Sequence, residues 1–309
     1  MKQFEPDGEA PAAAGDGVAA RLAGPVLPLQ PVPVSRPWGR TLADAWGCGL
    51  DFAPCIGEVH HLLHEGACPP GSDRLLLKTL YADAPLSVQV HPDAGTAARL
   101  GLAGPGQAPA KDEAWLVLSA APGARVGLGL QEAMSEDELR AAVLDGSIVD
   151  ALVWHEVRAG DALMVPAGTI HAIGAGVTLF EVQQNLDVTF RLHDHGRGRR
   201  LDLDAGLMVA RRERWTRPQP TAAAGPGRET LVSGDGFVME RVAGPGWLRP
   251  VDGRPAWMAV ISGACVAAGV PLAQGFTALA SGAVKLDGDA ELLLAQAGPV
   301  PQPGLWQPD

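Results

Sequence analysis

The chain has 309 residues, of which 47% are hydrophobic and 19% charged, so it can bury a large core in one elongated domain or two modest ones. Its formal net charge of −11 argues against a nucleic acid or an anionic membrane surface as partner. No apolar run approaches the roughly 18 residues that a membrane-spanning helix needs. The four cysteines match no zinc-ribbon or CxxC spacing, so we expect a cytoplasmic protein with reduced thiols.

The first residues, 1–25, lack the basic start and apolar stretch of a secretion signal, and we predict a disordered tail or an over-extended start there. Beyond them, short apolar runs separated by turn clusters are typical of an antiparallel sandwich or barrel. In the first part of the chain these runs are 74–82, 84–91, 113–119, 161–165, 176–183 and 188–193. The abundance of glycine and proline also favours a β-rich fold over a helical bundle.

Helical periodicity appears in two segments. In residues 131–147 the expected N-cap is Ser135, and Glu138 completes a capping box. Residues 201–214 show the same period, and residues 217–229 have the composition of a linker. A second set of short strands is predicted at 236–242, 256–262, 275–279, 283–286 and 290–295.

The chain after the linker contains no histidine, so any metal chemistry must lie before it. We therefore predict a metal-binding catalytic domain with helical segments over residues 26–216. Residues 217–309 are predicted to form a smaller β-domain that packs against it. Two other histidine-containing stretches in the first domain are discounted as ligands: HHLLH (60–64) is expected to be an outer strand with its turn, and His155 to lie in a short polar loop.

Residues 86–91 alternate apolar and polar side chains. A β-strand places Ser87, Gln89 and His91 on one face and the three apolar residues on the other. If the polar face met bulk water, charged residues would be expected, and in a dry core the amide and the imidazole would need partners. A wet, confined barrel interior satisfies both conditions, and a metal ion is a common occupant of such an interior.

Two further segments supply metal-binding groups. Glu113 opens a strand that is apolar on both faces, where a carboxylate is seldom left unpaired. His171 follows the tight turn PAGT at residues 166–169. Alone, each histidine would be interpreted as a hydrogen-bonded core residue. Together, His91, Glu113 and His171 form a competent metal set that is similar to the His2Glu class of zinc sites, with the Gln89 oxygen or a water as a fourth ligand.

Lysine is scarce in this chain, and two of its four lysines flank the strand at 86–91. These two are Lys78 and Lys111. Lysine differs from arginine in compactness and in the ease with which its pKa shifts, so we expect the retained lysines to have a specific use.

Residues 188–193 repeat the alternation of the first strand, with Thr189, Arg191 and His193 on the polar face. An arginine buried without a carboxylate partner is costly, so this pattern predicts an anionic ligand beside Arg191. A salt bridge to Asp187 or Asp194 is the alternative, although both have the opposite parity in the strand.

Seven segments carry a family resemblance: RPWG (36–39), IGE (56–58), LLLK (75–78), PLSVQVHPD (85–93), KDEAW (111–115), VPAGTIHAI (165–173) and QQN-DVTFRLHDHGR (183–197). Together they resemble the type I mannose-6-phosphate isomerases in their short bacterial form, motif by motif over residues 26–205. The segments PLSVQVHPD and VPAGTIHA at this separation are the most specific. Family members commonly carry tyrosine where this chain has Phe190, His193 and His195.

The resemblance implies a mainly β fold of two tandem cupin barrels (a bicupin) with a few helices, in which one barrel holds one zinc ion. By resemblance the zinc ligands are Gln89, His91, Glu113 and His171, the catalytic residues are Arg191 and Lys111, and the substrate-binding residues are Ser87, Lys78 and His193.

The activity that the resemblance implies is the interconversion of mannose 6-phosphate and fructose 6-phosphate through a cis-enediol. The proton-transferring base is left open among Lys111, His193 and a zinc-bound water. The expected partner is a small sugar phosphate, with no nucleic acid and no membrane, and the chain is expected to be a monomer or a homodimer.

Two other functions fit the same pattern. A cupin iron(II) oxygenase also uses two histidines and a carboxylate, although such cupins usually present His-x-His where this chain has Gln89 before His91. A non-catalytic sugar-phosphate-binding protein would keep the pocket without turnover.

Overall fold

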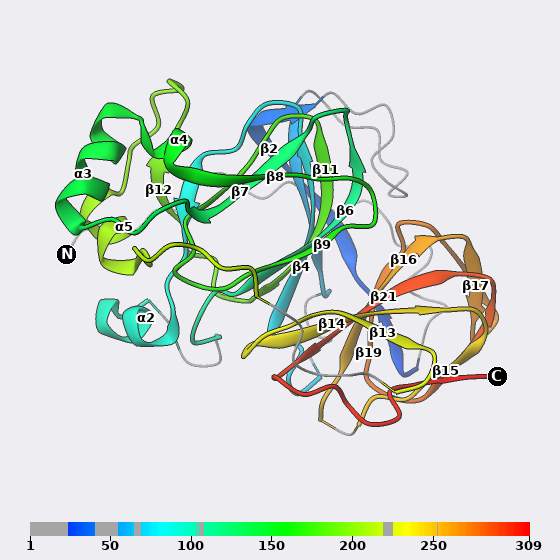
Figure 1. Cartoon of the computed structure of the whole chain (residues 1–309). Coiled ribbons are helices and arrows are strands. Elements are labelled where there is room, and N and C mark those ends of the chain that lie inside the picture. The colour runs from blue at the N-terminus through cyan, green and yellow to red at the C-terminus, as the bar shows by residue number, and fades with distance from the viewer. Residues whose placement is uncertain are drawn as a thin grey trace.

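The computed structural model describes residues 24–40, 55–64, 69–102, 104, 108–218, 225–251 and 253–309. The predicted tail, residues 1–25, lies outside the described residues except for its last two positions, and so do residues 219–224 of the predicted linker. Within the described residues the chain is mainly β, with antiparallel sheets and a few helices, as predicted (Figure 1). Two barrels lie side by side, and each is built from two sheets.

The first barrel consists of a six-stranded and a five-stranded sheet. The six-stranded sheet has the order β2 (Gln30–Arg40), β3 (Ile56–Leu62), β4 (Leu75–Ala82), β11 (Val177–Gln184), β6 (Glu113–Ala120), β9 (Ala162–Val165). The five-stranded sheet has the order β12 (Phe190–His193), β5 (Val88–Val90), β10 (His171–Ile173), β7 (Arg125–Leu130), β8 (Leu152–Glu156).

The second barrel is built in the same way. Its six-stranded sheet has the order β1 (Val26–Pro28), β19 (Thr277–Ala280), β16 (Ala256–Ser262), β21 (Glu291–Ala297), β14 (Phe237–Ala243), β13 (Arg228–Ser233). Its five-stranded sheet has the order β18 (Val270–Ala273), β17 (Ala264–Ala267), β20 (Val284–Gly288), β15 (Gly246–Leu248), β22 (Trp306–Pro308). Because β1 pairs with β19, the start of the described chain belongs to this sheet. The domain boundaries at residues 216 and 217 stay a prediction.

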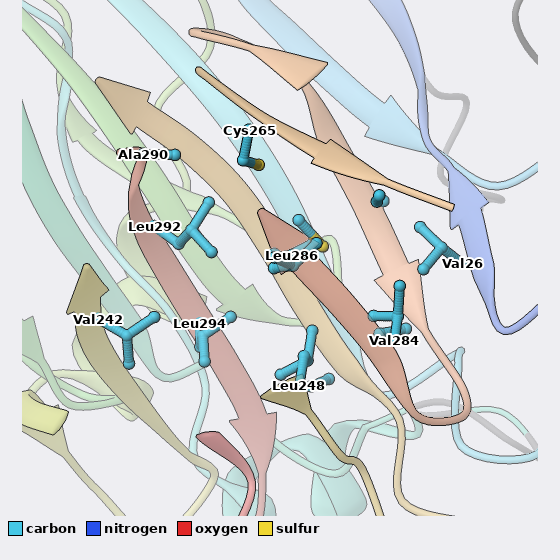
Figure 2. Close-up of a cluster of buried hydrophobic side chains, with 14 of the residues drawn as sticks. Val26, Val242, Leu248, Cys265, Val284, Leu286, Ala290, Leu292 and Leu294 are labelled. Atoms are coloured by element: carbon cyan, nitrogen blue, oxygen red, sulfur yellow. The ribbon is translucent and has the colours of Figure 1, made fainter. Parts of the chain in front are cut away.

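In the described part of the chain, four buried apolar clusters hold the layers together. One fills the second barrel and includes Leu248, Leu286 and Leu294 (Figure 2). Another fills the first barrel between its two sheets and includes Trp115. A third lies where the two six-stranded sheets face each other and includes Phe180 of the first barrel with residues of the second. The fourth lies on the outer face of the five-stranded sheet, under the helices of the first barrel.

The helices of the first barrel are α2 (Ala94–Leu100), α3 (Glu136–Asp145), α4 (Ile148–Ala151) and α5 (Leu203–Val209). The predicted start of the helix at 131–147 is confirmed, because Ser135 caps α3 and completes a capping box with Glu138. The helix predicted at 201–214 is shorter: after Val209 the chain turns extended, and the Arg211 amide donates to the Gly168 carbonyl. No helix in the described part of the chain is long and apolar enough to cross a membrane.

Two predictions about the discounted histidines are wrong. The segment 60–64 contributes to β3, but β3 lies between β2 and β4 and is therefore not an outer strand. The long strand β2 pairs with β3 and covers its outer edge, and the apolar runs in the sequence did not predict β2. His155 lies in β8 and not in a loop, and its ring packs on that of Trp215 at a centroid distance of 4.9 Å.

The strand predicted at 84–91 is also shorter than expected, since only Val88–Val90 pair as β5. Pro85 and Pro92 flank it, and proline has no N–H to donate to a ladder. The predicted alternation holds within this short strand: Val88 and Val90 pack in the cluster under the helices, and Gln89 points to the interior of the barrel.

Candidate metal and active site

The candidate metal site is a cluster of three buried side chains from both sheets of the first barrel. His171 is the first residue of β10 in the five-stranded sheet, and His91 directly follows β5 of the same sheet. Glu113 is the first residue of β6 in the six-stranded sheet. His91 Nε2 lies 3.0 Å from Glu113 Oε1, and His171 Nε2 lies 3.6 Å from Glu113 Oε2. One ligand atom of each residue lies within 4.8 Å of the others, which is compact enough for one ion.

The hydrogen bonds of the two imidazoles prepare them as ligands. His91 Nδ1–H donates to the Val188 carbonyl at 2.9 Å, and His171 Nδ1–H donates to the Thr169 carbonyl at the same distance. These bonds fix the tautomer that leaves each Nε2 with a lone pair toward the cluster. Within the described residues, His91 Nε2 and Glu113 Oε2 are buried and have no hydrogen-bond partner. The donor set and these two atoms fit a divalent ion.

The protonation states agree with this assignment. Burial lowers the pKa of His171 to about 4, with His91 adding to the effect, so the imidazole is neutral at pH 7. Burial likewise lowers the pKa of His91. Burial would raise the pKa of Glu113, but His91, Lys111 and His171 outweigh it and hold that pKa well below its usual value. Neutral imidazoles and an ionised carboxylate are the forms that bind a metal.

Gln89 lies at the edge of the same cluster. The strand register sets it directly opposite His171 in β10 and Arg191 in β12. Its amide nitrogen is 3.2 Å from His171 Nε2, and Ser87 Oγ donates to its oxygen at 3.2 Å. Since a half-turn of the amide exchanges its nitrogen and oxygen, Gln89 is placed to offer an oxygen as the fourth ligand.

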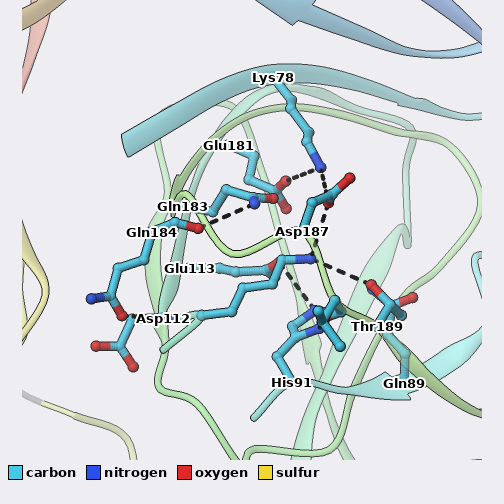
Figure 3. A network of polar contacts seen from close by, with 12 residues as sticks. Lys78, Gln89, His91, Asp112, Glu113, Glu181, Gln183, Gln184, Asp187 and Thr189 are labelled. Carbon is cyan, nitrogen blue, oxygen red and sulfur yellow. Dashed lines mark hydrogen bonds and ion pairs between the residues drawn. The ribbon is translucent and has the colours of Figure 1, made fainter. Parts of the chain in front are cut away.

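Glu113 of the cluster, together with Gln89, lines a cavity of about 600 Å³. Ser87, Lys78, Lys111 and Arg191, all expected at the site from the sequence, line this cavity. Figure 3 shows the polar contacts at its base, where lysine and carboxylate side chains from β4, β6 and β11 converge.

The two lysines are almost fully buried and share carboxylate partners. Lys78 Nζ lies 3.3 Å from Asp187 Oδ1 and 4.0 Å from Glu181 Oε1. Burial disfavours the Lys78 ammonium, but Asp187, Glu58 and Glu181 raise its pKa above the usual value. Lys111 Nζ lies 3.3 Å from Glu113 Oε1 and donates to Thr189 Oγ1 at 3.3 Å. The Lys78 ammonium therefore stays charged beside the metal cluster.

Arg191 is held by its own loop as well as by the strand. Its Nη1 donates to the Arg200 carbonyl at 2.9 Å, and its backbone amide donates to Asp202 Oδ2 at 3.1 Å. The acid that precedes β12, Asp187, lies instead beside the lysines, and Asp194 pairs with Arg197 and Arg199. The guanidinium of Arg191 thus lines the cavity from an anchored position.

His193 is the sequence-predicted residue that the structure does not bring to the cavity. The pairing of β12 with β5 shifts register after Arg191, so His193 pairs with Val88. Such a bulge breaks the two-residue alternation that had grouped His193 with Arg191. Its ring packs edge-to-face on His195 at 5.0 Å, and its position next to Gly146 places it by the turn between α3 and α4.

The sequence reasoning missed several charged residues that line the cavity. They are Arg36, Glu58, Glu181, Asp187 and Arg199. Glu181 is the most unusual of them: burial and the charge of Glu113 raise its pKa to about 8. Trp115 Nε1–H donates to its Oε2 at 3.1 Å. A signal for it was present, because a lone carboxylate in the apolar run 176–183 is as anomalous as Glu113 is in its own strand.

No family model matches this chain. Among curated proteins, the mannose-6-phosphate isomerase of Streptococcus mutans is 38% identical to it over 164 residues, which is 51% of this chain and 50% of the relative. The mannose-6-phosphate isomerase ManA of Bacillus subtilis is also 38% identical over 164 residues, 52% of this chain and 45% of the relative. The match therefore spans about half the length of these relatives.

The likeness in structure extends further. The crystal structure of mannose 6-phosphate isomerase from Bacillus subtilis aligns with a TM-score of 0.73 at 22% identity, over 86% of this chain and 98% of that one. The apo mannose 6-phosphate isomerase of Salmonella typhimurium aligns with a TM-score of 0.64 at 14% identity, over 89% and 100%. A further mannose 6-phosphate isomerase, bound with zinc and yttrium, aligns with a TM-score of 0.63 at 14% identity, over 89% and 100%. By sequence over about half of its length, and by fold over most of it, the chain resembles the mannose-6-phosphate isomerases, as its motifs indicated.

Proposed function

We propose that this protein is a zinc-dependent aldose–ketose isomerase that interconverts mannose 6-phosphate and fructose 6-phosphate through a cis-enediol. One observation carries the proposal: the carboxylate of a buried His-Glu-His cluster lines a cavity that is also lined by two buried lysines, an anchored arginine and a carboxyl group of raised pKa. The sequence relatives support the same reaction.

The charges of the cavity suit an anionic sugar. Lys78, Lys111 and Arg191 line it together with Arg36 and Arg199. One pair of charges about 4 Å apart is worth about 4 kcal/mol at an effective dielectric constant near 20. Surface charges beyond a Debye length of about 8 Å are largely screened. The cavity is lined by five lysine and arginine side chains and by four carboxyl groups, of which Glu181 has a raised pKa. The charge balance of its lining is therefore positive, in contrast to the net charge of −11 of the chain, and a phosphate dianion is a suitable ligand.

The metal would be held by His91, His171 and Glu113, with the Gln89 amide as a fourth donor. A bound zinc ion supplies Lewis-acid stabilisation of the negative charge that develops on the sugar oxygens during proton transfer. Lys111, which is 3.3 Å from Glu113, and Arg191 add positive charge on the cavity side of the cluster. These two residues would orient the open-chain sugar and stabilise the enediolate.

The isomerisation also needs a group that takes a proton from C2 and returns one to C1. Glu181 lines the cavity, and its raised pKa lets the carboxyl hold and release a proton near neutral pH. Lys78 lies 4.0 Å from it, and the Trp115 indole fixes its other oxygen. We therefore add Glu181 to Lys111 as a proton-transferring residue, whereas His193 lies away from the cavity.

A coupled assay with several sugar phosphates tests the proposal. We expect conversion of mannose 6-phosphate to fructose 6-phosphate, loss of the activity with a chelator and its recovery with zinc. Unphosphorylated mannose should be a poor substrate, because it cannot use the cations of the cavity. Binding of the sugar phosphate without turnover by zinc-loaded protein would indicate a binding protein, and stoichiometric iron with oxygen uptake would indicate an oxygenase.

A further inference from the structure

Asp112 stands between two residues of the proposed site, Lys111 and Glu113, but it does not line the cavity. Its Oδ1 accepts a hydrogen bond of 2.8 Å from the Ala167 amide. Its own amide donates to Gln184 Oε1 at 3.0 Å, and its carbonyl accepts from the Gln184 amide at 2.9 Å. Asp112 and Gln184 are next to each other at the margin of the polar network (Figure 3). These contacts therefore fix the position of Asp112, the residue directly before Glu113.

The Ala167 amide belongs to the turn between β9 and β10, the strand that begins with His171. This turn, residues 166–169, leads directly into His171. The next amide in the turn, Gly168, donates to the His91 carbonyl at 2.8 Å. The turn is thus bonded to the backbone of His91 and lies two to five residues before His171. Because Asp112 binds this turn, it fixes the position of Glu113 relative to His91 and His171.

The turn between β13 and β14 of the second barrel lies against Gln184, the hydrogen-bond partner of Asp112. A Cβ added at Gly236 would lie 2.5 Å from Gln184 Cδ, and one added at Gly234 would lie 2.4 Å from Met164 Cε. Gln184 is buried, so it cannot move into solvent to make room. The two glycines allow the turn of the second barrel to lie directly against Gln184, which bonds Asp112, and against Met164 of β9.

We propose that Asp112 and Gln184 are positioning residues, through which the Gly234–Gly236 turn of the second barrel holds the metal ligands of the first barrel in place. The inference deepens the proposed function, on which it rests, and it assigns a task to a barrel that has no histidine of its own. Groups outside the ligand set are known to change metal affinity when they orient the ligands.

The test compares variants of the full-length protein by metal binding. Asp112→Ala removes the acceptor for Ala167, and Asp112→Asn keeps one oxygen acceptor. Gly236→Ala presses on Gln184 from the second barrel without altering the first. The matched control is Gly225→Ala, because a Cβ at Gly225 meets nothing within 4 Å. Zinc affinity is measured by competition with a chelating dye, the ligand geometry by the visible spectrum of the cobalt(II) form, and folding by circular dichroism.

We expect Asp112→Ala and Gly236→Ala to bind zinc about tenfold more weakly than the wild type and to shift the cobalt spectrum. Asp112→Asn should recover part of the loss, and Gly225→Ala should match the wild type. Wild-type zinc affinity and an unchanged cobalt spectrum in folded Gly236→Ala and Asp112→Asn would overturn the inference, even if Asp112→Ala failed to fold. Because the readout is metal binding, the test is independent of the isomerase assay: a wild type without turnover contradicts the proposed function and leaves these comparisons valid.

Discussion

Each buried charge of the candidate site lies beside a partner of opposite sign. Asp187 Oδ1 is 3.3 Å from Lys78 Nζ and 3.9 Å from Lys111 Nζ, and Glu113 is next to Lys111. A buried charge that loses its partner is strongly destabilising, so single deletions in this network affect folding as well as chemistry. Variants that keep the shape and hydrogen bonds of a side chain are therefore the informative ones.

Glu181→Gln tests proton transfer in this way. The glutamine oxygen can still accept the bond from Trp115 Nε1, so the fold should hold. We expect kcat for mannose 6-phosphate to fall by roughly 10²- to 10⁴-fold, with little change in KM and a full zinc content. Steady-state kinetics and metal analysis provide the measurement. Glu156→Gln, at an exposed position in β8, is the matched control, and a wild-type kcat for Glu181→Gln would remove this residue from the mechanism.

His91→Ala tests the metal assignment. It removes one of the three ligand groups of the cluster, so zinc in the purified protein should fall from one equivalent toward none. The circular dichroism spectrum should stay that of a folded protein. His155→Ala, outside the cluster, should keep its zinc. Full zinc occupancy in His91→Ala would place the ion somewhere else.

At the scale of single elements, helix α3 shows how local signals position the site. Its buried residues, Leu139, Ala142 and Val143, belong to the apolar cluster that also contains Val88 and Val90 of β5. The helix layer therefore presses on the outer face of the strand whose inner face carries Gln89. Because the contact is made by the side opposite to the cavity, the helix affects the stability of the strand more than its chemistry.

Ser135→Ala should destabilise the protein without affecting catalysis. Ser135 Oγ accepts from the Glu138 amide at 3.2 Å, and the Ser135 amide donates to Glu138 Oε2 at 2.7 Å. Loss of an N-cap side chain costs about 1 kcal/mol. The free energy of unfolding measured by urea denaturation should therefore fall by that amount, with a lower urea midpoint and an unchanged kcat. Ser119→Ala, at an exposed position in β6, should leave the midpoint unchanged. An equal effect of both substitutions would contradict the assigned role of the cap.

At the scale of the whole molecule, the two barrels share one interface. Its apolar cluster combines residues such as Phe180 and Leu77 with Trp257 and Leu293. A polar bridge crosses the same interface: His61 Nε2 lies 2.9 Å from Thr79 Oγ1, and its Nδ1 lies 3.1 Å from Thr277 Oγ1 of the second barrel. The imidazole uses both nitrogens, so the neutral ring, with one donor and one acceptor, matches the two hydroxyl groups.

This bridge predicts a dependence of stability on pH. Burial lowers the pKa of His61 to about 3, with His60 adding to the effect. The unfolded chain binds a proton at His61 near pH 6.5, whereas the folded protein does not. The contribution of His61 to stability is therefore complete above pH 6.5 and is lost as the pH falls from there toward 3.

His61→Gln keeps a donor and an acceptor but does not titrate. Between pH 8 and pH 5 the free energy of unfolding of the wild type should fall by about 2 kcal/mol more than that of the variant. Urea denaturation at the two pH values measures this difference. Parallel pH profiles for the two proteins would show that His61 does not titrate on unfolding in this range.

Part of the site was predictable from local pattern. The alternation at 86–91 was enough to turn Gln89 inward, since residues two apart in a strand share a face, and the apolar surroundings of Glu113 marked it as a buried carboxylate. The same rule failed at His193, because a bulge after Arg191 shifts the strand by one position. Glu181 was missed because its neighbours, Lys78 on β4 and Trp115 on β6, meet it only when β11 pairs between those strands.

The sequence by itself therefore determined the β-rich class, the cap of α3 and the inward faces of the strands that carry the metal ligands. These features depend on residues close together in the chain, whose spacing sets their geometry. Only the tertiary structure decided which charged groups share one cavity and that the turn at Gly236 lies against Gln184. Both depend on pairing and packing between segments far apart in the chain, and no local pattern of residues specifies those partners.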